Sequence, residues 1–337
     1  MINVTKTYLP NLQKYNAYLK EIFQSGWVTN NGEMCKRLTA KLEQYLGVKN
    51  LVLVANGTLA LQIAYKLLNL SEEVITTPFS FVATVSSMVW EGLTPVFADI
   101  DNKSFNISVK CIENQITNET QAIVPVHVFG NACDIQDIQT LAKKYKLKVI
   151  YDASHAFGVN YNSKSILSYG DVSTISFHAT KLFHTIEGGA LVIKDDKLYQ
   201  KAKRMINFGY EQSEIKGLGI NTKMNELQAA MGLCILDDID AIIEKRKEVF
   251  DYYFSKLGSI VEFQSVSKKV TPNYSYVPVL FENEDVLISV VQKMNEVGVF
   301  PRRYFYPSLD SLSYLQNQYM PIARNISNRI LCLPTFY

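Results

Sequence analysis

The chain of 337 residues is long enough for two domains, because one domain usually takes about 100 to 200 residues. Hydrophobic residues make up 47% and charged residues 20%, which is close to the average of folded globular proteins and excludes a disordered or fibrous chain. The formal net charge of +2 is spread over short, interrupted basic runs, so the sequence does not indicate a nucleic-acid-binding face.

Short apolar runs rich in β-branched residues alternate with segments of helical period up to about residue 194. We expect seven strands, at residues 51–54, 74–76, 95–99, 122–127, 148–152, 174–177 and 190–194. Strands that alternate with helices predict an α/β domain with a mostly parallel sheet. Only a short link joins the last two strands, so we expect at least one antiparallel member.

The segments between the strands have recognisable helix ends. We expect helices within residues 32–47, 58–70, 81–92 and 134–146. Gly47 and Gly92 end the first and third of these segments, as glycine commonly does. Asp134 opens the fourth and is expected to be its N-cap.

The pattern changes after residue 221. A long helical stretch at 223–258 is followed by strand candidates at 260–264 and 274–281, and by a helix at 284–296 that Gly298 closes. This order predicts a smaller α+β domain joined by a long helix. We therefore expect a large domain of residues 1–240 and a small C-terminal domain of residues 241–337.

Cysteines, histidines and apolar runs narrow the class of protein further. The five cysteines are widely spaced without a C-x-x-C pair, so we expect reduced, mostly buried thiols. The four histidines lack the H-E-x-x-H spacing, so we predict no metal site. No run approaches 18 consecutive apolar residues and the N-terminus has no apolar signal region, so we expect a cytoplasmic protein without a membrane span.

Several residues follow predicted strands at the edge where ligands bind in open α/β sheets. Gly57 and Thr58 lie between a strand and a helix, where free backbone N–H groups and the helix dipole suit a phosphate; a plain helix cap is the alternative. Asp152 ends a strand, where a carboxylate is costly without a cationic partner; an N-cap aspartate is the alternative.

Phe81 and Lys181 complete this set. Phe81 follows a strand, where a ring would stack on a planar cofactor or join the core. Lys181 has the apolar neighbours Phe177, Leu182 and Phe183, which favour loss of its proton and a nucleophilic amine; a solvated surface lysine is the alternative. A phosphate cradle, an aspartate, an aromatic ring and such a lysine are together what pyridoxal 5'-phosphate (PLP) requires.

Longer motifs support this interpretation. They are SGWVTNNG, PFSFVAT, PVFADID, PVHVFGNACDI, IYDASHAFG, SFHATKLFHTIEGGAL and GLGINTKMNELQAAMG. In order and spacing they resemble the DegT/StrS family of PLP-dependent nucleotide-sugar aminotransferases, within the fold-type I (aspartate aminotransferase-like) superfamily. The resemblance implies an α/β fold with a mostly parallel seven-stranded sheet, helices on both faces and a smaller C-terminal α+β domain.

The resemblance implies roles for the residues around the ring of the cofactor. Lys181 would form the Schiff base with PLP and act as the catalytic residue, and Asp152 would hold the ring nitrogen. His155 would lie beside the ring, and Phe81 would stack on it.

The resemblance also implies how the phosphate is held. Gly57, Thr58 and Ser176 would bind the phosphate of the chain's own cofactor. Asn221 would reach the phosphate of the neighbouring subunit's cofactor, which implies a homodimer with shared active sites.

The reaction implied is a transamination in two halves. L-Glutamate would convert PLP to pyridoxamine phosphate, and the amine would then pass to the keto carbon of a nucleotide-linked sugar while Lys181 moves the proton. The stretches FHATK…EGGA and RRYFYPSL are most similar to the branch that converts dTDP-4-keto-6-deoxy-D-glucose to dTDP-4-amino-4,6-dideoxy-D-glucose. Such amino sugars serve surface polysaccharides, including lipopolysaccharide O-antigens. Family members with histidine in place of this lysine are dehydratases.

The substrate side is less clearly marked. The residues expected to bind substrate are Trp27, Thr29, Asn30, Arg302, Tyr304 and Tyr306. A guanidinium offers a bidentate fork to a sugar diphosphate or a carboxylate, although a solvated strand end is the alternative for the residues from Arg302 onward. Ser308 and Leu309 stand where many members have a histidine, and the chain stops at LCLPTFY where relatives usually continue, so we expect a naturally short or truncated end.

Two alternatives remain at the level of sequence. One is a 3-ketosugar or cyclitol aminotransferase of the same family, because spacing does not fix which carbon is aminated. The other is a non-catalytic PLP-binding regulator, since a fold does not prove a function. The presence of Lys181, Asp152 and Ser176 together favours an enzyme.

Overall fold

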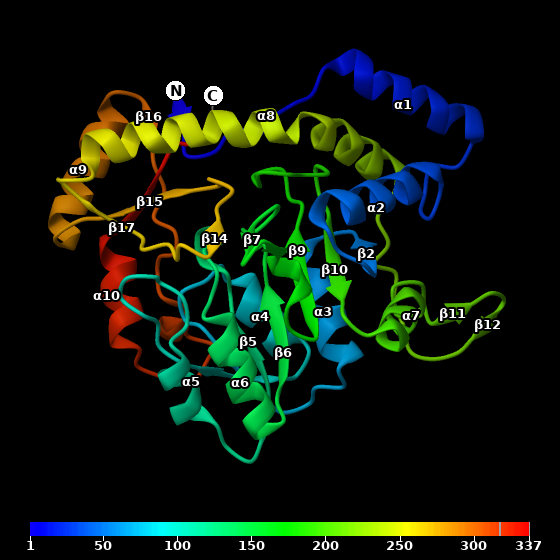
Figure 1. The fold of residues 1–337 in the computed structure, drawn as a ribbon, viewed down its shortest axis with the longest axis horizontal. Helices are drawn as coiled ribbons and strands as arrows, with labels where there is room; N and C mark the ends of the chain where they lie inside the picture. The colour runs from blue at the N-terminus through cyan, green and yellow to red at the C-terminus, as the bar shows by residue number, and fades with distance from the viewer. Residues whose placement is uncertain (317, 337) are drawn as a thin grey trace.

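A computed structural model describes residues 1–316 and 318–336. Its centre is a seven-stranded sheet with the order β2-β10-β9-β6-β5-β3-β4 (Figure 1). The strands are β2 (Leu51–Val54), β3 (Glu73–Thr76), β4 (Thr94–Phe97), β5 (Thr120–Val124), β6 (Lys148–Asp152), β9 (Val172–Ser176) and β10 (Gly189–Ile193). All seven predicted strands are confirmed, with ends shifted by at most a few residues.

The direction of the strands places the candidate lysine. β10 is antiparallel to both of its neighbours, β2 and β9, whereas the other pairs in the sheet are parallel. The predicted antiparallel member is therefore β10. Gly189 of β10 pairs with Ser176 of β9, so the loop of residues 177–188 leaves and re-enters the sheet at its carboxyl edge. Lys181 lies in this loop.

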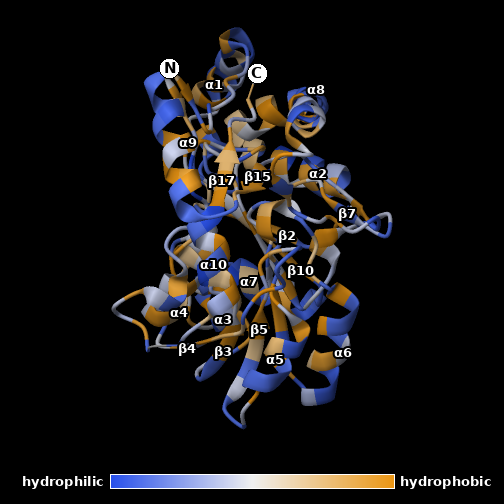
Figure 2. Cartoon of the chain, turned by 90° about the vertical axis from the view of Figure 1, so that its left-hand side faces the viewer, coloured by the Kyte–Doolittle hydropathy of each residue, from blue (hydrophilic) through white to orange (hydrophobic). Residues whose placement is uncertain are grey.

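Helices cover both faces of the sheet, as predicted. Successive residues of a strand point to opposite faces, so Val149 and Tyr151 pack on one side and Ile150 on the other. One side is covered by α2 (Glu33–Leu46), α5 (Val109–Gln115), α6 (Ile135–Tyr145) and α8 (Glu226–Leu257). The other is covered by α3 (Gly57–Leu67), α4 (Ala83–Trp90) and α7 (Asp196–Met205). In Figure 2, the helices around the sheet carry both blue and orange segments, as amphipathic covering helices do.

A smaller antiparallel sheet lies beyond the long helix α8, in the order β13-β15-β17. Its strands are β13 (Glu262–Phe263), β15 (Val277–Leu280) and β17 (Ile330–Leu333), and its helices are α9 (Glu284–Glu296) and α10 (Pro321–Arg329). The predicted helix at 284–296 is confirmed, and the two predicted strands are shorter than expected. The expected domain boundary at residue 240 falls inside α8 and stays a prediction.

The remaining α-helix and strands are short or lie near the N-terminus. They are α1 (Leu12–Ser25), β1 (Ile2–Asn3), β7 (Asn160–Tyr161), β8 (Lys164–Ser165), β11 (Tyr210–Glu211), β12 (Glu214–Ile215), β14 (Val270–Thr271) and β16 (Val299–Phe300). β1 pairs with β16, which joins the N-terminus to the C-terminal part of the chain.

Two local expectations can be compared with the structure. Asp134 stands at the N-cap position of α6, as predicted, although its side chain makes no capping hydrogen bond. The cysteines are free thiols, and four of the five are buried, as predicted. Within residues 1–316 and 318–336, no helix is both long and apolar enough to cross a membrane.

Candidate active site

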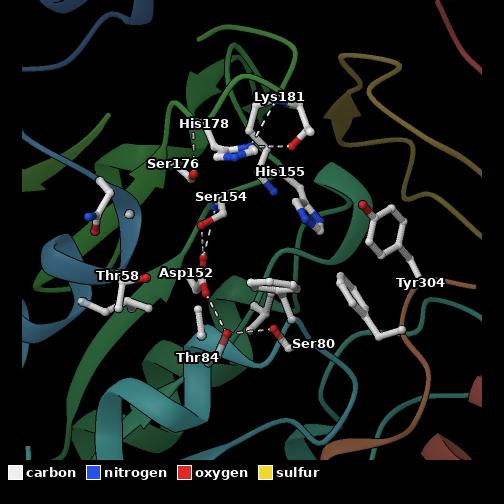
Figure 3. A pocket seen from close by; sticks show the side chains of 18 of the residues that line it. Thr58, Ser80, Thr84, Asp152, Ser154, His155, Ser176, His178, Lys181 and Tyr304 are labelled. Atoms are coloured by element: carbon white, nitrogen blue, oxygen red, sulfur yellow. Dashed lines mark hydrogen bonds between the residues drawn. The ribbon is translucent and has the colours of Figure 1, made fainter. Parts of the chain in front are cut away.

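A cavity of about 260 Å³ opens at the carboxyl edge of the large sheet (Figure 3). Its walls come from the ends of β6 and β9, the loop after β9, the first turns of α3 and α4, and Arg302, Tyr304 and Phe305. The predicted residues that line it are Gly57, Thr58, Phe81, Asp152, His155, Ser176, Lys181, Arg302 and Tyr304. Segments far apart in the sequence thus meet at one place.

Asp152 is buried at the end of β6 and held by three hydrogen bonds. Its Oδ1 accepts from the backbone N–H and the hydroxyl of Ser154, at 3.1 and 2.6 Å, and its Oδ2 accepts from the hydroxyl of Thr84 at 2.9 Å. The following residues 153–159 form turns rather than a helix, so Asp152 does not cap a helix. Its carboxylate is fixed at the cavity instead.

Lys181 is partly buried in the loop after β9. Burial lowers the pKa of its amine to about 8, although the negative charge of Asp152 acts in the opposite direction. The neighbouring rings of Phe177 and Phe183 are buried edge to face, with centroids 4.9 Å apart, and fix the two sides of the loop. A lysine with this pKa provides a substantial fraction of free amine near neutral pH.

His155 is a buried neutral ring in the same cavity. Burial lowers its pKa well below the ordinary value, with a smaller contribution from the charge of Lys181. Its Nδ1 accepts a hydrogen bond from the backbone N–H of Phe129 at 3.2 Å, so in the neutral ring Nε2 bears the proton. The ring of Phe305 stacks on it with centroids 5.6 Å apart and an interplanar angle of 7°.

The N-terminus of α3 meets the end of β9 closely. A Cβ on Gly57 would lie 2.9 Å from the Cβ of Ser176, and a Cβ on Gly189 would lie 2.7 Å from the backbone carbon of Asn56. Only glycine allows this approach. The side chain of Asn56 caps α3 by accepting from the N–H of Leu59 at 2.9 Å. The result is a helix N-terminus that faces the cavity beside a serine hydroxyl, which suits a phosphate.

The structure distinguishes between the two interpretations of Phe81, a core residue or a ring at the cavity. Its side chain is 51% exposed and lines the cavity, so it is not a core residue. Arg302 and Tyr304 also line the cavity, with the guanidinium 4.5 Å from the centroid of the tyrosine ring. Arg303, by contrast, forms an ion pair with Glu284 at 2.6 Å and is not among the lining residues.

Some predicted residues lie outside the cavity lining. They are Trp27, Thr29, Asn30, Asn221 and Tyr306. The ring nitrogen of Trp27 donates to the backbone oxygen of Asn30 at 2.7 Å, within the loop before α2. The exposed Asn221 forms a β-bridge with Asn207. A single chain therefore does not bring these residues to the cavity.

Several lining residues were not predicted. Ser80, Thr84 and Ser154 lie inside the motifs PFSFVAT and IYDASHAFG, so position within those motifs was the available signal. Phe305 lies inside the stretch RRYFYPSL in the same way, whereas the sequence offered no signal for Tyr276 as a site residue.

His178 and Glu187 lie close to each other at the cavity. His178 and Glu187 both line it, and Nε2 of the histidine lies 3.4 Å from a carboxylate oxygen of the glutamate. Nδ1 of the histidine lies 2.8 Å from the hydroxyl of Thr180. Among the described residues, no group of three or more histidine, cysteine, aspartate or glutamate side chains is arranged to hold a metal ion.

Comparison with known sequences places this geometry in context. Residues 12–337 match the model of the DegT/DnrJ/EryC1/StrS aminotransferase family. A dTDP-4-amino-4,6-dideoxy-D-glucose transaminase of Shigella dysenteriae is 45% identical, over 99% of this chain and 93% of the relative. A protein of the same name from Escherichia coli is 37% identical, over 99% and 94%. A GDP-perosamine synthase of Escherichia coli O157:H7 is 34% identical, over 98% and 92%.

Solved structures agree with the sequence comparison. DesI, determined in the presence of its TDP-sugar product, superposes with a TM-score of 0.93 at 29% identity, over 99% of this chain and 88% of that one. Helicobacter pylori PseC, an aminotransferase of pseudoaminic acid biosynthesis, gives a TM-score of 0.92 at 27% identity, over 99% and 94%.

Proposed function

Because the chain belongs to the DegT/DnrJ/EryC1/StrS aminotransferase family, we propose that it transfers the amino group of L-glutamate to C4 of dTDP-4-keto-6-deoxy-D-glucose. The product would be dTDP-4-amino-4,6-dideoxy-D-glucose, which is the sugar in the names of two similar relatives. The enzyme is a PLP-dependent transaminase of fold type I. We place its product in the synthesis of a surface polysaccharide of the O-antigen type.

The observation that carries this proposal is the common cavity of Lys181 and Asp152. An amine with a pKa of about 8 and a buried carboxylate fit the two ends of a pyridoxal ring. The tight approach of Gly57 to Ser176 leaves a helix N-terminus for the phosphate. When bound, PLP supplies an electron sink for the substrate carbon. The residues that would hold it are Gly57, Thr58, Phe81, Asp152, His155, Ser176 and Lys181.

The side chains at the cavity would have separate roles in the reaction. Nζ of Lys181 would accept and return the proton at the substrate carbon, because a base with a pKa near the working pH is effective in both directions. Asp152 would orient the ring through its fixed carboxylate, and neutral His155 would pack beside it. Arg302 would bind an anionic part of the substrate, since its guanidinium lies at the cavity.

We further propose a cytoplasmic homodimer with shared active sites. The segment that precedes Asn221 exposes apolar side chains, with Phe208, Leu218 and Ile220 exposed by 51%, 80% and 47%. Exposed apolar groups close together in the sequence support burial against another surface. Asn221 would then approach the cofactor of the partner subunit, and the loop that contains Trp27 would join the sugar pocket.

The proposal is tested with purified protein, PLP, L-glutamate and dTDP-4-keto-6-deoxy-D-glucose. We expect 2-oxoglutarate to be released in a 1:1 ratio with an aminated product whose nitrogen NMR places on C4. Lys181→Ala serves as the inactive control. Amination of a 3-ketosugar or a cyclitol ketone, with none of the 4-ketosugar, would replace this substrate assignment. A bound cofactor whose absorbance never responds to L-glutamate would support the non-catalytic regulator.

A further inference from the structure

A chain of two buried hydroxyls leads to the carboxylate of Asp152. The hydroxyl of Thr84 lies 2.9 Å from Oδ2 of Asp152, and the hydroxyl of Ser80 lies 2.8 Å from that of Thr84. Thr84 is 1% and Ser80 is 3% exposed, and both line the cavity. Figure 3 shows the three side chains in a row at the floor of the cavity, with dashed lines between them.

The direction of these hydrogen bonds follows from the chemistry of the groups. A carboxylate only accepts, so the single hydrogen of the Thr84 hydroxyl is donated to Asp152. The Thr84 oxygen then accepts from Ser80. The backbone of Thr84 is held as well, because its carbonyl accepts from the hydroxyls of Tyr65 at 3.4 Å and Ser87 at 3.2 Å. Donation to Asp152 and acceptance from Ser80 set the orientation of the Thr84 hydroxyl, while Tyr65 and Ser87 contact only its backbone carbonyl.

The hydrogen bond from Thr84 limits which acceptor site of Asp152 remains open to another donor. A carboxylate has about four acceptor sites, two on each oxygen. Ser154 occupies two through Oδ1, and Thr84 occupies one through Oδ2. The site left for a further donor is therefore on Oδ2, the oxygen that Thr84 also binds. Without the Thr84 hydrogen, the carboxylate would be free to turn toward the amine of Lys181, whose pKa its charge already raises.

We propose that Thr84, supported by Ser80, is the positioning residue that directs the remaining acceptor site of Asp152 toward the ring nitrogen of PLP. This inference rests on the role proposed above for Asp152. Thr84 acts on the cofactor only through that carboxylate. The Thr84 hydroxyl holds the carboxylate of Asp152 toward the ring nitrogen, and this keeps the ring nitrogen protonated.

The test uses Thr84→Val, which removes the hydroxyl and keeps the shape, and Thr84→Ser, which restores it. The readouts are the dissociation constant for PLP and the ¹⁵N NMR signal of ring-labelled PLP. We expect Thr84→Val to weaken PLP binding by about 10- to 100-fold, because a hydrogen bond to a charged group is lost, and to move the ring nitrogen toward its unprotonated signal. Thr84→Ser should return both readouts to within about threefold of the native values.

A matched control is Ser87→Ala on the same helix. Ser87 is 2% exposed and contacts the backbone of Thr84 but not Asp152, so its loss should leave both readouts unchanged. If Thr84→Val does not fold, Ser80→Ala replaces it, with a smaller change expected in the same direction. An unchanged ring nitrogen signal in the folded Thr84→Val or Ser80→Ala protein would overturn the inference.

Asp152→Asn separates this inference from the proposed function. If Asp152→Asn alters the ring nitrogen signal and Thr84→Val does not, only the role of Thr84 fails. If neither variant alters it, the role proposed for Asp152 fails first. If both alter it and Thr84→Ser is native-like, both roles hold.

Discussion

The two ends of the candidate site differ in how many of their predicted residues the single chain brings to the cavity. At the cofactor end, Lys181, Asp152 and the first turn of α3 meet in one cavity and are held by contacts within the chain. At the outer end, two segments that we call the outer segments, residues 26–32 and 207–221, hold predicted residues that do not line this cavity. Parallel strands and their covering helices therefore fix the cofactor end, whereas the outer end is the part of the site for which we propose a second copy of the chain.

The packing of the two regions explains this difference. The strands that end at the cavity are buried on both faces, so their register determines where Asp152 and Ser176 lie. The outer segments contain only the two-residue strands β11 and β12, and such a hairpin is marginal on its own. Trp27 is 56% and Leu218 is 80% exposed there. We propose that the outer segments gain further stability by packing on the second copy.

The largest effect is expected when two inactive variants are mixed. This experiment tests whether the outer end of the site comes from the second subunit. Lys181→Ala lacks the catalytic amine, and Asn221→Asp would place a carboxylate against the phosphate that Asn221 is predicted to approach. If Asn221 acts across the dimer, a mixed dimer contains one intact site, with Lys181 from one subunit and Asn221 from the other. Since half of the dimers in an equal mixture are mixed, activity should recover to about a quarter of the native value.

The control for this experiment is each variant incubated with itself, which should stay inactive. Native mass spectrometry on tagged subunits would verify that mixed dimers form. Mixed dimers without recovered activity would show that Asn221 serves its own chain, and the contrast between the two ends would lose its explanation.

The pH dependence of cofactor capture sharpens the description of the cofactor end. The free amine is the nucleophile and burial lowers the pKa of Lys181 to about 8, so the rate at which the apoenzyme bonds PLP should rise about tenfold per pH unit below pH 8 and level off above it. Asp152→Asn removes a charge that raises this pKa, so the inflection should move to lower pH. Stopped-flow absorbance measures both.

N-acetyl-lysine and PLP in solution provide the reference for this measurement, because they report the titration of the cofactor itself. An apoenzyme profile that still rises toward the ordinary lysine value of 10.5 would mean that the cavity does not desolvate the amine.

The sequence predicted the cofactor end better than its immediate surroundings. The strands were predictable because each is a short apolar run between turn residues, and β6 and β9 are adjacent, so Asp152 and Ser176 could be expected at one edge. The partner of Asp152 was not predictable, because Thr84 lies 68 residues away and meets it only through the placement of α4. Arg303 follows Arg302 in the sequence, but Glu284 on α9 binds it, a pairing that no local pattern indicates.

Short or solvent-facing elements were also hard to predict, because local sequence patterns do not mark them. The helix α1 and the two-residue strands were not predicted, since β1 and β16 pair across almost the whole chain and neither has a run long enough to show a period. Residues of the outer segments were predicted from the family resemblance, and in the single chain they do not line the cavity.

The smallest effect is expected where an outer segment is attached to the folded body. Glu226, 2% exposed, accepts from the backbone N–H groups of Met34 and Cys35 at 2.8 and 3.1 Å, while its own N–H donates to the oxygen of Thr29 at 2.9 Å. The N-cap of α2, Gly32, offers no side chain, so this carboxylate caps the helix from α8. Glu226→Gln leaves one donor without an acceptor and should lower the free energy of unfolding by about 1–3 kcal/mol in urea titrations.

Glu21→Gln is the matched control, because Glu21 forms a surface ion pair with Arg37 at 3.0 Å and its loss should cost less than about 1 kcal/mol. Equal losses in the two variants would contradict the capping role of Glu226. Since Glu226 lies outside the cavity lining, the dissociation constant for PLP should stay at the native value in Glu226→Gln. A rise in the KM for the nucleotide sugar at unchanged PLP affinity would then show that the loop of residues 26–32 contributes to substrate binding. It would also show that cofactor binding depends on the cavity and not on this loop.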